Sequence, residues 1–392
     1  NKATPTLSIS NTPQVYDGTP KAATVTGSVA GTVSNVQYDA AATAPTNAGT
    51  YAVTADFIPT NANYNTLSGA SAGSFVINKA AVTLSISNSP VVYSGAAQAA
   101  TVVGSVAGTV SNVLYGASSA APTNAGTYAV KADFTPTNTN YDTLSGASAG
   151  NFVINKATPT LAVTNSPQVY NGAAQAATVV GSVAGTVSNV RYNGSLTVPT
   201  GAGSYPMTAN FVPTDGTNYN SLTSTTAGNF VIDKAPTTTT VTCTGAPFTY
   251  TGLAQTPCAA SVTGAGGLNQ SGLTVTYSNN TNAGTASASA TYEPTANYLT
   301  SSDSTTFTIG KATPTLSVTN SPLVFDGTAR TATVVGSVGG AVSNIQYAGS
   351  STAPTNAGTY AVTADFAPTD DVNYNSLTGG GAGSLVINKA PS

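Results

Sequence analysis

Residues 45–57 read PTNAGTYAVTADF, and this stretch decides the fold because it joins a turn to the longest alternating run in its neighbourhood. Asn47 and Gly49 favour a turn, since Asn and Gly tolerate backbone conformations that other residues avoid. The apolar residues that follow share one face of an extended chain: Tyr51, Val53, Ala55 and Phe57. A period of two is typical of a half-buried β-strand, so we expect a strand over residues 51–57.

The same stretch recurs along the chain at a nearly constant spacing. The Lys-Ala pair that marks the register begins at residues 2, 79, 156, 234, 311 and 389, which gives spacings of 77, 77, 78, 77 and 78. Such self-similarity predicts a tandem array. We divide the chain into copy 1 (1–78), copy 2 (79–155), copy 3 (156–233), copy 4 (234–310) and copy 5 (311–388). Residues 389–392 begin a further joint, so we expect a longer array, with any export signal outside these residues.

Other segments of copy 1 also have the composition of short strands. They are TLSIS (6–10), KAATVTG (21–27), SNVQY (34–38) and SFVIN (74–78). Turns separate them, as at Tyr16-Asp17-Gly18, where Gly18 can take a positive φ. Six or seven strands per copy, with frequent Gly and Pro and no helical period, predict an immunoglobulin-like sandwich of two sheets.

A β-solenoid is the alternative architecture for a β-rich repeat. Solenoid coils usually repeat every 20–50 residues or so and need their neighbours to bury a core, whereas a copy of about 77 residues can enclose its own. At about 35 Å per copy, five sandwiches end to end would span about 170 Å. We therefore expect an all-β chain of five tandem sandwiches in an extended rod.

The composition excludes several classes of protein. Charged residues make up 6% of the chain, compared with about 25% in an average soluble domain. The 39 Gly and 22 Pro residues remain below the proportion typical of disordered sequence, and aromatic residues recur at fixed places, so the chain should fold. The ten Lys and Arg residues are scattered, which argues against nucleic acid as a partner, and no apolar run is long enough to span a membrane.

The recurring motifs resemble the MBG-type bacterial immunoglobulin-like repeat of large surface and secreted proteins. In copy 1 they stand as YDG (16–18), NAGTY (47–51), NANY (61–64) and FVINKA (75–80). Copy 3 departs to GAGSY (201–205), and copy 4 departs to NAGTA (282–286) and FTIGKA (307–312). The resemblance implies a spacer or adhesive array at a bacterial surface, without a shared catalytic residue. The recurring turn and core positions, which we expect to be structural, are Tyr16, Gly18, Gly49, Tyr51, Phe57, Tyr64 and Lys79.

Both cysteines lie in copy 4. Comparison with the other copies places Cys243 on the inner face of the first strand and Cys258 at the start of the next main strand. We therefore expect a disulfide between Cys243 and Cys258, which implies an oxidising compartment; two buried free thiols are the alternative.

The sequence gives little support to catalysis. It contains no His, which removes Ser-His hydrolysis, His-ligated metals and imidazole acid–base chemistry. Glu293 is the only Glu, and the position of Asp56 is taken by Asn210 and Thr291 in other copies. A pair of facing carboxyl groups, as a glycosidase requires, is therefore not expected. We expect that the chain is not an enzyme.

Four loops rich in Asn and Asp invite a comparison with calcium sites. They contain Asn61 and Asn63, Asn138 and Asn140, Asp215 and Asn218, and Asp370, Asp371 and Asn373. Calcium prefers several carboxylate oxygens, and the first two loops offer none, so we expect turns and no cofactor, with calcium as the alternative. A Lys-Asn isopeptide bond at residues 78 and 79 is disfavoured for want of a buried acid, and the sequons at Asn193, Asn269 and Asn279 are no more than composition predicts.

The leading interpretation is an extracellular structural stalk or spacer of a surface or secreted adhesin-like protein. Its partners would be other domains of the same longer chain. The alternatives are a self-assembling extracellular filament or surface-layer subunit and, with less support because there is no Trp, a module that binds surface glycans. Copy 4, with its Cys pair and sole Glu, is the copy most expected to differ.

Overall fold

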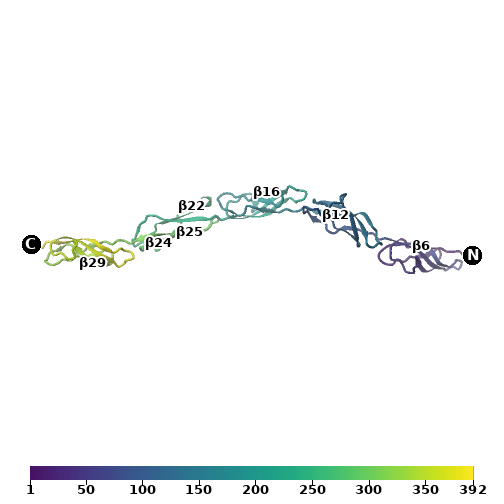
Figure 1. Ribbon diagram of the computed structural model, residues 1–392, viewed down its shortest axis with the longest axis horizontal. Helices are drawn as coiled ribbons and strands as arrows, with labels where there is room; N and C mark the ends of the chain where they lie inside the picture. Colours follow the sequence, from purple (N-terminus) through teal and green to yellow (C-terminus); the bar gives the residue numbers. More distant parts are fainter. Residues whose placement is uncertain (392) are drawn as a thin grey trace. The chain divides into compact units, whose positions relative to one another are not determined.

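The computed structural model describes residues 1–391 and is nearly all β (Figure 1). Among these residues there is no α-helix, and hence no helix that could cross a membrane; a single 3-10 turn, η1 (Ala265–Gly267), is present. The chain divides into two compact units. The first comprises Asn1–Leu161, Gly181–Ser188 and Ala209–Thr225, and the second comprises Ala162–Val180, Asn189–Thr208 and the chain from Thr226 onward. This division passes through copy 3, so the copy boundaries remain a prediction.

Copy 1 contains six strands in two sheets. They are β1 (Leu7–Ile9), β2 (Gln14–Val15), β3 (Val25–Gly27), β4 (Gly31–Tyr38), β5 (Gly49–Pro59) and β6 (Leu67–Asn78). The larger sheet has the order β2-β6-β5-β4, and β1 pairs with β3 in the smaller one. Pairing is antiparallel except between β2 and β6, which run parallel.

The strand order of copy 1 recurs. In copy 2 the strands are β7 (Leu84–Ile86), β8 (Val91–Val92), β9 (Val102–Gly104), β10 (Gly108–Tyr115), β11 (Gly126–Pro136) and β12 (Leu144–Asn155). Copy 5 contains β26 (Leu316–Val318), β27 (Leu323–Val324), β28 (Val334–Gly336), β29 (Gly340–Tyr347), β30 (Gly358–Pro368) and β31 (Leu377–Asn388). In copy 3, across which the two units divide, they are β13 (Leu161–Val163), β14 (Gln168–Val169), β15 (Val179–Gly181), β16 (Gly185–Tyr192), β17 (Gly203–Pro213) and β18 (Leu222–Asp233).

Copy 4 differs in its smaller sheet. Its strands are β19 (Thr237–Cys243), β20 (Phe248–Thr249), β21 (Cys258–Gly264), β22 (Leu268–Ser271), β23 (Thr276–Ser278), β24 (Gly284–Tyr292) and β25 (Ser301–Gly310). The smaller sheet has three strands, in the order β19-β21-β22, because a hairpin through η1 adds β22 to its edge. The first strand is also longer, since β19 has seven residues where β1 has three.

The core of copy 1 lies between its two sheets. The alternation expected over residues 51–57 is present in β5, where Val53 is 0% and Phe57 is 1% exposed. Phe75 and Ile77 of β6 are equally buried, and apolar residues of β1 and β3 pack against this cluster. Large Phe and Ile side chains therefore fill much of the core.

Three expected strands differ from the structure by three or more residues at one end. The strand expected at 34–38 begins three residues earlier, and the closing strand begins at Leu67 because β6 pairs with β5 along most of its length. The strand expected at 21–27 is shortened to Val25–Gly27. The amide of Asn11 explains this, because it bonds the carbonyl of Ala22 and the N–H of Thr24 at 2.8 and 2.7 Å and so replaces a ladder pair.

Candidate joints between neighbouring copies

The recurring motifs meet where one copy joins the next. At the first joint, the N–H of Tyr16 donates to the carbonyl of Asn78 at 3.0 Å, which holds the end of β6 within copy 1. Two residues later, the N–H of Ala80 donates to the carbonyl of Asn140 at 3.0 Å, which holds the chain within copy 2. Only Lys79 lies between the two bonded residues, so the connection has few free dihedral angles.

This one-residue connection recurs at three further places. The lysines at its centre are Lys156, Lys234 and Lys311. On their N-terminal side, Tyr93, Tyr170 and Tyr250 donate to the carbonyls of Asn155, Asp233 and Gly310 at 2.8–2.9 Å. On their C-terminal side, Ala157, Ala235 and Ala312 donate to the carbonyls of Asn218, Asn297 and Asn373 at 2.9 Å.

A pair of tyrosine rings packs across each joint. The rings of Tyr16 and Tyr141 lie 5.4 Å apart between centroids and meet edge to face at 86°. Equivalent pairs join Tyr93 to Tyr219, Tyr170 to Tyr298 and Tyr250 to Tyr374, at 5.3–5.4 Å. Edge-to-face pairs of this kind contribute about 0.5–1.5 kcal/mol beyond the apolar area that they bury.

An asparagine amide connects the NAG turn of one copy to the next copy. The Oδ1 of Asn140 accepts the N–H of Ala48 at 2.8 Å, while its Nδ2 donates to Oδ1 of Asn47 at 3.0 Å. Asn218 and Asn373 make the same two bonds to the turns of copies 2 and 4. These two amides are the most buried, at 5% and 7% exposure, because Asp215 and Asp370 close over them.

The joint between copies 3 and 4 replaces one of these bonds. Gly201 stands where the other joints have Asn, so Asn297 bonds only the N–H of Ala202, at 2.9 Å. The η1 turn of copy 4 adds a contact instead: Gly266 lies so close to Gly172 that a Cβ on Gly172 would be 2.5 Å from the Cα of Gly266. The hydroxyl of Tyr298 donates to the carbonyl of Ala265 at 2.7 Å. Burial, and then the neighbouring Tyr170, raise the pKa of Tyr298.

The lysines themselves stabilise the loop that precedes each Asn-Tyr pair. Lys156 donates to the carbonyl of Gly216 at 2.5 Å, Lys234 donates to that of Thr295 at 2.6 Å, and Lys311 donates to that of Asp371. Lys79 is exposed at the first joint. The lysines therefore lie at the surface and not in the core, and three of them donate a hydrogen bond to a loop carbonyl.

The other recurring positions occupy turns and the core. Gly18 has a φ of 81°, as its turn requires, and Phe57 is in the core. The hydroxyl of Tyr51 donates to the carbonyl of Asn47 at 2.7 Å, across the turn that ends at Gly49. Tyr64 pairs with Ala3 at the start of its own copy. Sequence reasoning placed these residues in one repeat but missed that Tyr16 and the Asn-Tyr motif meet across a joint.

Copy 4 contains a disulfide between Cys243 and Cys258. The two residues are direct cross-strand neighbours of β19 and β21, and the side chains are half-buried beside Phe248 and Tyr277. The bond closes a span of 15 residues that includes β20. It therefore ties the first and third strands of this copy together.

The acidic side chains are occupied by local hydrogen bonds. Asp17 pairs with Lys21 and with Thr19, which hold the pKa of its carboxyl well below the usual range. Asp56 accepts the N–H of Gly69 at 2.7 Å and the amide of Asn35, and these bonds likewise lower its pKa. Asp17 is therefore an acceptor within a turn, whereas Asp56 of β5 accepts from the neighbouring strands β6 and β4.

The Asn- and Asp-rich loops form turns. The Oδ1 of Asn61 accepts the N–H of Asn63 at 3.0 Å, and Asp215 accepts the N–H groups of Thr217 and Asn218. Within residues 1–391 no cluster of three or more His, Cys, Asp or Glu is arranged to hold a metal ion. The Oδ1 atoms of Asn61 and Asp215 thus accept backbone N–H groups within these turns.

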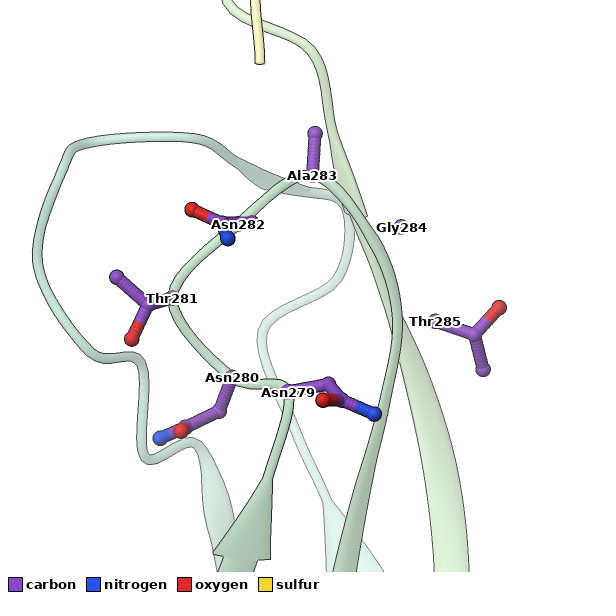
Figure 2. A pocket seen from close by; sticks show the side chains of 7 residues that line it. All are labelled: Asn279, Asn280, Thr281, Asn282, Ala283, Gly284 and Thr285. Atoms are coloured by element: carbon purple, nitrogen blue, oxygen red, sulfur yellow. The ribbon is translucent and has the colours of Figure 1, made fainter. Parts of the chain in front are cut away.

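One hollow coincides with a joint motif. The turn Asn279–Thr285 of copy 4 encloses about 480 Å³, and Figure 2 shows its asparagine and threonine side chains around an open bend with Ala283 at the top. No residue that lines it is ionisable. The N–H of Ala283 donates to Oδ1 of Asn373 in copy 5 at 2.8 Å. This hollow therefore lies at the joint between copies 4 and 5.

Comparison with known families identifies the repeated unit. The family model described as MBG domain matches residues 5–81, 80–158, 159–236 and 314–391, which leaves most of copy 4 outside the matched ranges. Because these matches cover most of the chain, it belongs to the MBG domain family. No curated protein matches the chain. A repeat protein of this family with one disulfide is consistent with an extracellular location.

Proposed function

We propose that this chain is an extracellular structural spacer in which each copy is held firmly against the next. The observation that carries the proposal is the joint, which recurs four times with the same parts. A single lysine separates backbone hydrogen bonds to two copies, and a tyrosine pair with an asparagine amide closes over it. A flexible linker would not need these recurring contacts.

The location and the absence of catalysis are part of the same proposal. A disulfide favours an oxidising compartment, and MBG domains fit a surface or secreted protein. The chain has no His, and carboxylates such as Asp17 in its turn and Asp56 in β5 accept local hydrogen bonds. These features support a structural role and offer no pair of groups for acid–base chemistry.

The filament alternative has less support at the sheet edges. β4 lies at the edge of the larger sheet, and its pairing with β5 is interrupted by a bulge at Asn35, which has a φ of 49°. Asn112 and Asn344 have the same conformation in β10 and β29. A bulged edge resists pairing with another chain, so edge-to-edge polymerisation is disfavoured.

Light scattering with small-angle X-ray scattering tests the spacer. We expect a monomer whose largest dimension is near the length of five sandwiches, about 170 Å. The variant Asn140→Ala/Asn218→Ala/Asn297→Ala/Asn373→Ala should become shorter on average and more variable. Asn63→Ala, at the equivalent position of copy 1, is the matched control. Open-ended polymers would instead favour the filament, and a compact wild-type particle would contradict both.

A further inference from the structure

We propose that the chain bears tension, and that the parallel pairing of the second strand with the last strand is what resists extension in copies 1, 2, 3 and 5, whereas in copy 4 the disulfide diverts the tension from this pairing. This inference rests on the proposed spacer role, because a spacer is pulled whenever the bodies that it joins move apart. The inference concerns the force that unfolds a copy, whereas the scattering experiment concerns the stiffness of the joints between copies. One of these two claims can therefore be wrong while the other is correct.

The geometry of copy 1 shows why this pairing would be loaded. β2 pairs in parallel with β6, through Gln14 with Ile77 and Val15 with Asn78, and Tyr16 donates to Asn78 beyond them. Tension pulls β2 toward its N-terminal end and β6 toward its C-terminal end. Because the strands are parallel, the two pulls are opposed along one axis, and the hydrogen bonds must break together rather than in succession.

The same pairing is present in every copy. The strand pairs are β8 with β12, β14 with β18, β20 with β25 and β27 with β31. In copies 1, 2, 3 and 5 a hydroxyl just before the second strand also holds the last strand. Thr12, Ser89, Ser166 and Ser321 accept the N–H groups of Val76, Val153, Val231 and Val386 at 2.9–3.0 Å.

Copy 4 lacks this hydroxyl and has its disulfide nearby. Ala246 stands at the position of Ser89, so the N–H of Thr308 has no hydroxyl acceptor from that residue. Tension that enters β19 crosses from Cys243 to Cys258 and bypasses β20. β19 also has seven pairs with β21, whereas β1 has three with β3. While the disulfide is intact, tension on copy 4 therefore falls on the disulfide and the β19–β21 pairs and not on the pairing of β20 with β25.

Pulling single molecules of the whole chain at constant speed tests the first part of the inference. In copy 5 the N–H of Phe325 donates to Asn388 at 2.9 Å, and the ring is 36% exposed. Phe325→Pro removes that donor, while Phe325→Ala keeps it and removes only the ring. We expect one of the unfolding forces to fall in Phe325→Pro and none in Phe325→Ala. Equal forces in the two variants would overturn the proposal.

Two further variants separate mechanical strength from thermal stability. Val342→Ala removes core volume from β29, away from this pairing, and should lower the melting temperature with little change in unfolding force, since forced unfolding follows the unfolding barrier. Ser89→Ala removes one hydroxyl acceptor from copy 2 and should lower one unfolding force even if Phe325→Pro fails to fold. A larger loss of force in Val342→Ala than in Ser89→Ala would contradict the inference.

The disulfide should make the unfolding event of copy 4 differ from the others in the length of chain that it releases. While it is intact, 15 residues stay closed, so one unfolding event should lengthen the chain by about 50 Å less than the others. The force of that event should depend on the disulfide and the β19–β21 pairs. Reductant should restore its full length, load the pairing of β20 with β25 and change the force of this event alone. If reduction restored the length and left the force unchanged, the disulfide would have no mechanical role.

Discussion

At the residue scale, the joint asparagines are the most informative side chains. Asn218 is 5% exposed and uses both ends of its amide, accepting the N–H of Ala125 at 2.7 Å and donating to Asn124 at 3.2 Å. Asn63 is the same residue of copy 1, but its side chain is exposed. Asn218 is therefore a residue of a joint, and Asn63 is its matched exposed control in the same chain.

Replacing Asn218 should open the joint between copies 2 and 3. Asn218→Ala leaves the N–H of Ala125 without its acceptor, which should cost about 1–3 kcal/mol of local stability. Amide exchange at Ala125, followed by mass spectrometry, should be faster by about 5- to 150-fold. Asn63→Ala is the control and should change nothing comparable; equal exchange in both variants would show that Asn218 does not hold the joint.

Two glycines of copy 1, Gly27 and Gly31, lie where a buried aromatic ring approaches the backbone closely. A Cβ on Gly27 would lie 2.3 Å from Cζ of Phe57, and one on Gly31 would lie 2.4 Å from the same atom. Neither glycine is among those with a positive φ. Their recurrence in the sequence is thus explained by the close approach of a buried ring, which the alternating pattern of β5 alone does not reveal.

This close approach predicts a difference between two glycines of copy 5. In Gly336→Ala the new methyl group would meet Phe366 at 2.5 Å, so overpacking should cost about 1–3 kcal/mol of unfolding free energy. Gly381 has open space around it and serves as the control. Urea unfolding of the two variants measures the difference. Similar midpoints would mean that Phe366 has room to move.

At the scale of the element, several carboxylates join neighbouring strands of the larger sheet through side-chain hydrogen bonds. In copies 1 and 2, Asp56 and Asp133 accept the N–H of Gly69 and of Gly146 at 2.7 Å. Asn210 makes the equivalent bond in copy 3, to the N–H of Ser224 at 2.8 Å. A neutral acceptor therefore suffices for the geometry, and the charge affects only the dependence on pH.

The direction of that dependence follows from the lowered pKa values. Hydrogen bonds lower the folded pKa of Asp56, through Gly69 and Asn35, and of Asp133, through Asn112 and Gly146. These carboxylates therefore stabilise the fold above their unfolded pKa of about 3.9, and this contribution disappears as the pH falls through the folded values. Asp56→Asn/Asp133→Asn should lose less stability between pH 6 and about 2.5, as measured by urea unfolding. A parallel decline in both proteins would assign acid sensitivity to other groups.

The disulfide should stabilise copy 4 alone. Closing a span of 15 residues restricts the unfolded chain, so its loss should cost about 3 kcal/mol in this copy. Amide exchange with and without reductant would show faster exchange in β19 and β21 only. Cys243→Ala/Cys258→Ala should already exchange faster and should not respond to reductant. A response spread over all copies would contradict the assignment.

The sequence predicted the elements better than their connections. The alternation of residues 51–57, the turn at Gly18 and the cross-strand placement of Cys243 could be read from local patterns and internal comparison. Strand ends could not, because Asn11 ends one pairing with its side chain. The joint was missed for another reason: Tyr16 and Tyr141 are far apart in sequence, and both recur for a purpose that only their contact reveals.

At the scale of the whole molecule, the account depends on how firmly neighbouring copies are held. The contacts at each joint are few, but they leave a single lysine between bonded residues. Their repetition is the basis for proposing a spacer. Stiffness at one joint is therefore the property to measure directly.

Pulsed electron–electron resonance between spin labels on copies 1 and 2 measures it. Ser8→Cys and Ser85→Cys place labels on exposed, equivalent positions of β1 and β7 while the native disulfide remains closed. We predict one narrow distance distribution, which should broaden when Asn140→Ala/Tyr141→Ala is added. A native distribution as broad as that of the joint variant would contradict the central claim that the joints hold the copies in place.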